Sequence, residues 1–119
     1  MTPKEQIAQA KKELNTLSDA HITRVMVAYG LPKPIFEHRF VQSRRWRADL
    51  YFECNGVRLA VEVEGGAWTQ GRHTRGAGFI KDMEKYNRYT LEGIWLFRCV
   101  PDDLLTIDFL SMIKAKLRL

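Results

Sequence analysis

Apolar and polar residues alternate along residues 47–64, and this pattern predicts a two-stranded β-hairpin. Asn55-Gly56 lies at its centre and favours a two-residue type I′ turn, because both residues tolerate a positive φ. With such a turn Cys54 faces Val57, and the register of every further pair follows by counting outward along both strands. One face of the hairpin is then apolar and consists of Ala48, Leu50, Phe52, Leu59, Val61 and Val63.

Other segments of the chain also carry the periodicity of regular structure. Apolar residues recur at helical spacing in some of them, whereas others alternate or are continuously apolar, as strands are. Helices are predicted over residues 2–17, 18–29, 79–92 and 104–117, and strands over residues 35–41 and 94–100. This order predicts an α/β (α+β) fold with a mixed sheet: an antiparallel meander of three strands, a helical crossover to a further strand, and flanking helices.

The same patterns predict which residues are buried. Residues 94–100 are continuously apolar apart from Arg98, which predicts a strand buried on both faces. The last two helices are predicted to face the core with Phe79, Met83, Tyr86 and Thr90, and with Ile107, Leu110, Ile113 and Leu117, respectively.

The 119 residues are predicted to form one domain, residues 1–119, in which the thin apolar stripe of residues 1–17 indicates a mobile N-terminal helix or arm. The net charge of +5 favours a polyanionic partner. Cys54 and Cys99 match no disulfide framework or zinc spacing, so reduced thiols are expected. Since no apolar leader or membrane span is evident, we expect a cytoplasmic protein.

The polar face of the hairpin contains an unusual pair of acidic residues. The register places Asp49 opposite Glu62, whereas neighbouring pairs, such as Arg47 with Glu64, have opposite signs. Like charges directly opposite each other destabilise a sheet, so the pair requires a raised pKa, a flanking arginine or a bound cation. Mg²⁺, with Mn²⁺ as a substitute, is the sharpest hypothesis, because hard cations bind carboxylate oxygens. Neutralisation by Arg47 or Arg58 is the structural alternative.

Basic residues lie on both sides of this acidic pair in the sequence. The glycine-rich stretch of residues 65–78 can approach a phosphate backbone closely, and its His73 could move a proton or simply be solvated. The candidate phosphate- or DNA-contacting residues are Arg44, Arg45, Arg47, Arg72, Arg75, Lys81, Lys85 and Arg88.

Asp49, a short hairpin and then Glu62-Val63-Glu64 together resemble the motif of the PD-(D/E)XK nuclease superfamily. In that superfamily an acidic residue on one strand and an acid-x-Lys triplet on the next bind Mg²⁺ and cut DNA. The strings RRWRADLYF, LAVEVEGGAW and GRHTRGAGFIKDMEKYN are similar to small phage and prophage nucleases related to very-short-patch-repair endonucleases. The resemblance covers residues 36–98, roughly half of the chain.

The resemblance implies a restriction-endonuclease-like core and assigns roles to residues of this chain. Asp49, Glu62 and the carbonyl group of Val63 would hold the metal, and Glu64 would support it or position water. The catalytic residues it implies are Asp49, Glu62, Glu64, His73, Lys81 and Lys85.

Two positions depart from the family pattern. Glu64 occupies the place of the motif lysine, so the catalytic lysine would have to be Lys81 or Lys85 on the following helix. Related enzymes often add an acidic residue from the helix before the sheet, and here that helix offers only Asp19.

The function implied is a divalent-metal-dependent DNA endonuclease, a phosphodiester hydrolase encoded by a bacteriophage and acting on duplex, nicked or branched DNA in processing, repair or recombination. Two opposed cuts would require a homodimer on the substrate or two binding events. The alternatives are a non-catalytic nucleic-acid-binding protein on a degenerate nuclease fold and an accessory protein that acts on a host protein.

Overall fold

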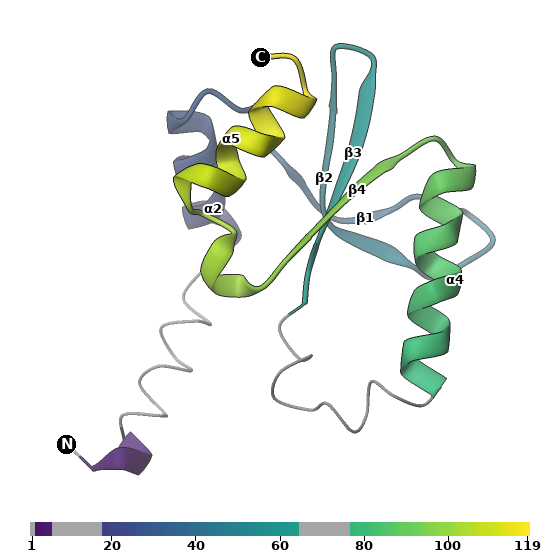
Figure 1. Cartoon of the computed structure of the whole chain (residues 1–119), viewed down its shortest axis with the longest axis horizontal. Coiled ribbons are helices and arrows are strands. Elements are labelled where there is room, and N and C mark those ends of the chain that lie inside the picture. The colour runs from purple at the N-terminus through teal and green to yellow at the C-terminus, as the bar shows by residue number, and fades with distance from the viewer. Residues whose placement is uncertain (1, 6–17, 65–76) are drawn as a thin grey trace.

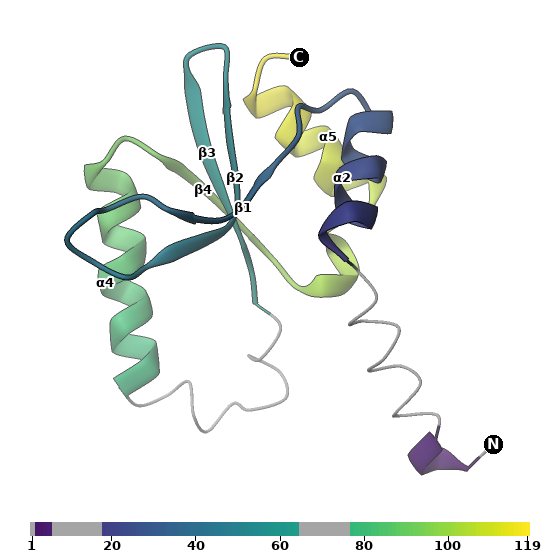
Figure 2. The same ribbon diagram turned by 180° about the vertical axis from the view of Figure 1, so that it is seen from behind.

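The structure, a computed structural model, describes residues 2–5, 18–64 and 77–119 and contains a four-stranded mixed sheet with helices on both faces (Figure 1). Figure 2 shows the same arrangement from behind. The elements are α2 (Asp19–Ala28), β1 (Ile35–Arg39), β2 (Arg47–Cys54), β3 (Val57–Val63), α4 (Ala77–Leu91), β4 (Trp95–Cys99), a 3₁₀ turn (Pro101–Asp103) and α5 (Ile107–Lys116).

The strands lie in the order β1-β2-β3-β4. β1, β2 and β3 form an antiparallel meander, and β4 pairs parallel to β3 after the crossover through α4. The predicted meander, crossover and further strand are therefore confirmed. No helix in the described ranges is long and apolar enough to cross a membrane.

The hairpin turn has the predicted conformation and register. Asn55 and Gly56 have φ values of 53° and 75°, and the pairs run from Cys54–Val57 to Leu50–Val61. The pairs predicted further out, Asp49 with Glu62, Ala48 with Val63 and Arg47 with Glu64, are not part of this ladder. Beyond Leu50 and Val61 each strand keeps only its outer neighbour, β1 or β4. We call this divergence, formed by residues 47–49 and 62–64, the strand fork.

Two clusters of buried side chains hold the helices on the sheet. The larger lies between the sheet and the helices α2 and α5, and it includes Phe52, Leu59 and Val61, as the hairpin pattern predicted (Figure 1). The smaller lies under α4 and consists of Ala48, Tyr51, Ala60, Tyr89 and Ile94, with partly buried neighbours around it.

Ala48 was predicted to share a face with Leu50 and Phe52, but it belongs to the cluster under α4. β1 is irregular beside this point: Glu37 has a φ of 51°, and the β1–β2 ladder omits the pair of Glu37 with Asp49. A left-handed residue interrupts the regular alternation of a strand pair. The strict two-residue period therefore does not extend through the strand fork.

Three other predictions of burial are wrong in part. Among the α4 side chains that the structure describes, residues 80–91, the fully buried one is Tyr89, whereas Met83 and Thr90 are exposed. The side chain of Phe79, also predicted to face the core, lies outside the described residues. On α5 Ile107 is 71 % exposed, contrary to the prediction, and Phe109 is buried instead. The predicted burial of Leu110, Ile113 and Leu117 is confirmed. β4 is an edge strand whose Trp95 is 56 % exposed, so its apolar run does not reflect burial on both faces.

The N-terminus of α2 follows its prediction. The Ser18 hydroxyl accepts a hydrogen bond from the backbone N–H of His21 at 3.1 Å, as an N-cap does, and Gly30 ends the helical segment with a φ of 96°. The predicted mobile N-terminal arm falls mainly on residues 6–17, which lie outside the described residues.

Candidate active site

Glu62 lies on β3 at the strand fork and is only 5 % exposed. Its Oε1 atom is 2.6 Å from the Nζ atom of Lys85 and accepts a hydrogen bond from the Tyr89 hydroxyl at 2.5 Å. Burial raises the pKa of Glu62 to about 7, although the contacts with Lys85 and Tyr89 act in the opposite direction, and the charge of Asp49 raises it slightly further. A carboxyl group with a pKa in this range can lose or take a proton at neutral pH.

Lys85 reaches Glu62 from α4. Its Nζ atom also donates a hydrogen bond to the carbonyl oxygen of Arg47 at 2.7 Å, so the ammonium group connects both arms of the strand fork. Lys85 and Tyr89 are one helical turn apart, which places both on the face of α4 that meets β3. Of the two lysines considered for the catalytic role, the structure brings Lys85 to the acidic strand, whereas Lys81 is exposed.

Glu64, the residue in the place of the motif lysine, has a separate set of partners. Its Oε1 atom accepts hydrogen bonds from the Tyr86 hydroxyl and from Nε of Arg98, the latter at 2.9 Å. The guanidinium carbon of Arg98 also lies 4.6 Å from the centre of the Tyr86 ring. Burial and the neighbouring Glu64 carboxylate raise the pKa of the Tyr86 hydroxyl, which therefore remains a proton donor to Glu64.

The arginines predicted to neutralise the acidic residues do not do so. Arg47 lies opposite Arg39 on β1, and the Arg58 side chain donates to the carbonyl oxygen of Glu92. Lys85 and Arg98 take their places, because the α4 crossover and the parallel strand β4 bring cations that are distant in sequence.

Asp49 is half-buried on the other arm of the strand fork. Its Oδ2 atom accepts a hydrogen bond from the backbone N–H of Val63 at 2.7 Å, so a side chain replaces the missing backbone pair between β2 and β3. Asp49 also lines a hollow of about 280 Å³ together with Asp19 and Glu37. Within the described ranges, however, no three or more His, Cys, Asp or Glu side chains are grouped so that they could hold a metal ion.

Mg²⁺ commonly takes one or two carboxylates and completes its shell with water and substrate oxygens. The strand fork offers two carboxylates with different surroundings: Glu62 contacts Lys85 and Tyr89 of α4, whereas Asp49 lines the hollow beside Ile22 and Leu104. Both contacts described for Glu62 involve Oε1, and the backbone contact of Asp49 involves Oδ2. Among the contacts between described residues, Oε2 of Glu62 and Oδ1 of Asp49 take part in none, and the Val63 carbonyl group lies next to Glu62 in sequence.

The remaining predicted residues have mixed outcomes. Arg72, His73 and Arg75 lie outside the described residues. Arg45 and Arg47 are exposed, as backbone-contacting residues would be. Two other arginines form ion pairs within the chain: Arg44 with Glu84 at 3.1 Å and Arg88 with Glu92 at 2.8 Å.

Tyr86, Tyr89 and Arg98 are parts of the site that the sequence did not predict. Arg98 was visible as the one charge in an apolar strand, and a charge in such a position indicates a specific partner.

Comparisons with family models, with curated proteins and with solved structures found no match to this chain.

Proposed function

We propose that this protein is a divalent-metal-dependent DNA endonuclease on a restriction-endonuclease-like core, of the kind that phages encode for DNA processing, repair or recombination. The observation that carries the proposal is the contact between Lys85 and Glu62. The family motif has a lysine two residues after the acidic residue on the second strand, and here that position is Glu64. Lys85 of the crossover helix lies against Glu62 instead.

In this proposal the residues of the site have different roles in phosphodiester hydrolysis. A metal ion held by Asp49, Glu62 and the Val63 carbonyl group would lower the pKa of an attacking water and neutralise charge on the phosphate. Lys85 offers an ammonium group for a phosphate oxygen or for the attacking water, and its contact with the Arg47 carbonyl fixes its position.

Glu64 has a supporting role in this proposal. Tyr86 and Arg98 hold its carboxylate in place, and the guanidinium group of Arg98 has further N–H donors for a phosphate. The positive net charge of the chain favours the approach of a polyanion.

The competing proposal is non-catalytic nucleic-acid binding on the same fold. It is supported by the neutralisation of Glu62 by Lys85 and by the lack of a three-residue metal-ligating cluster in the described part of the chain. In that case Glu62 and Lys85 would form only a structural ion pair.

The two proposals differ in metal-dependent cleavage. Linear, nicked and branched DNA are incubated with the protein in Mg²⁺, Mn²⁺ or EDTA, using wild type, Glu62→Gln, Lys85→Met and the matched control Lys81→Met. We expect cleavage with either metal and none in EDTA, complete loss in Glu62→Gln and Lys85→Met, and retention in Lys81→Met. Binding without any cleavage by wild type would favour the non-catalytic protein.

The salt dependence of DNA binding tests the third alternative, a protein that acts on a host protein. With about six phosphate contacts, affinity should fall by roughly 10³-fold between about 50 and 200 mM salt. A flat response would contradict DNA binding as the function.

A further inference from the structure

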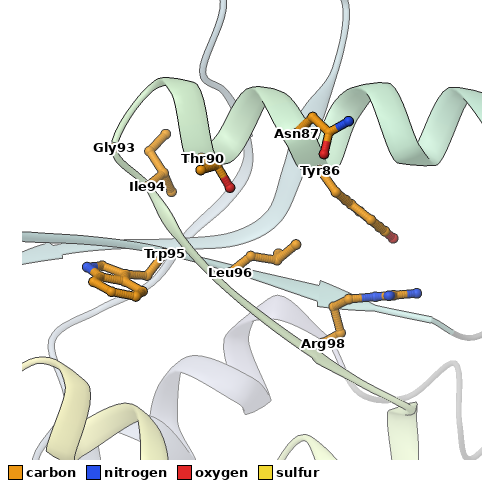
Figure 3. Close-up of a pocket in the computed structure, with 8 residues that line it drawn as sticks. All are labelled: Tyr86, Asn87, Thr90, Gly93, Ile94, Trp95, Leu96 and Arg98. Atoms are coloured by element: carbon orange, nitrogen blue, oxygen red, sulfur yellow. The ribbon is translucent and has the colours of Figure 1, made fainter.

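A cavity of about 580 Å³ lies between α4 and the edge strand β4 (Figure 3). Tyr86 and Thr90 extend from α4 toward β4, and Leu96 points from β4 into the space between them (Figure 3). Asn87 lies along the α4 side, and Trp95 and Arg98 lie at opposite ends of the β4 side (Figure 3). The volume is within the range of roughly 300–1,000 Å³ typical of ligand pockets.

The groups that line this cavity suit a nucleobase. Single-stranded bases are bound by stacking on aromatic rings or on the guanidinium plane of arginine, and by hydrogen bonds to their edges. Tyr86 and Trp95 supply rings, Arg98 supplies a guanidinium group, and Asn87 and Thr90 supply a side-chain amide and a hydroxyl group.

The cavity shares two residues with the candidate active site. Tyr86 and Arg98, which form one end of the cavity, are the two residues that bind Glu64. Arg98 and Glu64 also line an adjoining hollow of about 340 Å³. A nucleotide with its base in the cavity would therefore have its phosphate group beside the guanidinium group of Arg98.

The charges around β4 favour a polyanion over a second copy of the chain. Nζ of Lys116 lies 3.2 Å from the centre of the Trp95 ring, and the Arg98 side chain is 55 % exposed. Two copies paired through their β4 edges would bring these cations together, whereas a nucleic acid would neutralise them.

We propose that the cavity between α4 and β4 binds an unpaired nucleobase, so that the preferred substrate is DNA with an extrahelical or single-stranded nucleotide next to the phosphate that is cut. The position of the cut rests on the proposed nuclease function, whereas binding of the base does not.

Binding in EDTA separates the base site from catalysis. Fluorescence anisotropy compares three labelled duplexes: one fully paired, one with a single-nucleotide bulge, and one with an abasic bulge. We expect wild type to bind the normal bulge at least about fivefold more tightly than the other two, the lower end of the effect of stacking one base on an aromatic residue.

Two variants with the same new side chain test whether the cavity itself binds the base. Thr90→Phe fills the cavity, and Leu91→Phe places the same ring on the neighbouring residue, which is 80 % exposed and does not line it. Thr90→Phe should lose the preference for the bulge and Leu91→Phe should keep it. Asn87→Ala, which opens the cavity rather than filling it, should weaken the preference even if Thr90→Phe folds poorly.

The outcomes distinguish failure of the two proposals. Equal binding of paired and bulged DNA by wild type, or equal preference in Thr90→Phe and Leu91→Phe, would overturn the base site. A preference that persists in wild type while no DNA is cut in Mg²⁺ would support the base site and refute the nuclease function. Glu62→Gln should abolish cleavage and keep the preference.

Discussion

The buried carboxyl group of Glu62 should make the stability of the metal-free protein depend on pH. Its pKa is about 7 in the folded protein, compared with an ordinary value of 4.5. Below pH 4.5 both states carry the proton, and the folded state keeps its full stability. As pH rises from 4.5 to about 7, the unfolded chain releases the proton first, so the free energy of unfolding falls. At 1.36 kcal/mol per pKa unit the loss is about 3 kcal/mol.

Glu62→Gln tests this directly, because the amide has nearly the same shape and no ionisable proton in this range. Urea unfolding in EDTA, at several pH values between about 4.5 and 7.5, gives the free energy of unfolding of both proteins. We expect the variant to gain about 3 kcal/mol relative to wild type across this interval. Glu84→Gln, at a position where the side chain is more than half exposed, should follow wild type.

Parallel curves for wild type and Glu62→Gln would refute the argument. They would mean that Lys85 keeps the Glu62 carboxylate charged throughout, so that the ion pair outweighs the cost of burial. A larger difference than about 3 kcal/mol would indicate that burial dominates even more strongly.

Three further predictions concern the same elements. Lys85→Met leaves the Glu62 carboxylate buried without its cation and should cost about 3 kcal/mol by urea unfolding at pH 8; adding Glu62→Gln should restore most of this, and simple additivity in the double variant would contradict the pairing. Burial raises the pKa of the Cys99 thiol to about 12, so iodoacetamide should modify the half-buried Cys54 in the native protein and Cys99 only after unfolding, as read by mass spectrometry. Gly93→Ala should lower stability by about 1 kcal/mol or more, because Gly93 has a φ of 73°; an unchanged melting temperature would refute this.

Local sequence signals predicted the hairpin well and the strand fork poorly. Asn55-Gly56 fixes the turn, and the alternation of apolar residues carries the register from Cys54–Val57 to Leu50–Val61. Beyond that point the outer neighbours β1 and β4 decide the pairing, and their influence is not encoded in the hairpin itself. The prediction that Asp49 pairs with Glu62 in the ladder is therefore wrong, although both residues lie just beyond its last pair, Leu50–Val61.

The partners of the acidic residues depend on long-range packing. The pattern of α4 was interpreted as a face containing Met83 and Thr90, whereas the helix buries Tyr89, whose hydroxyl bonds to Glu62. Because a tyrosine side chain is partly polar, it is only a weak signal of burial in a hydrophobicity pattern. In the same way, the apolar run of β4 could not distinguish an edge strand from a central one, because that depends on what lies beside it.

The parallel pairing of β3 with β4 also has a consequence for the order of folding. The hairpin closes across two residues, whereas Leu59 and its partner Trp95 are 36 residues apart. Formation of the β3–β4 pair therefore has a larger entropic cost of loop closure than formation of the hairpin. A chain in which only the hairpin has formed would have Asp49 and Glu62 but neither Lys85 nor Arg98 beside its carboxylates. The site would thus be assembled in the last steps of folding. Under the proposed nuclease function, a nascent or partly unfolded chain would then leave nucleic acid uncut.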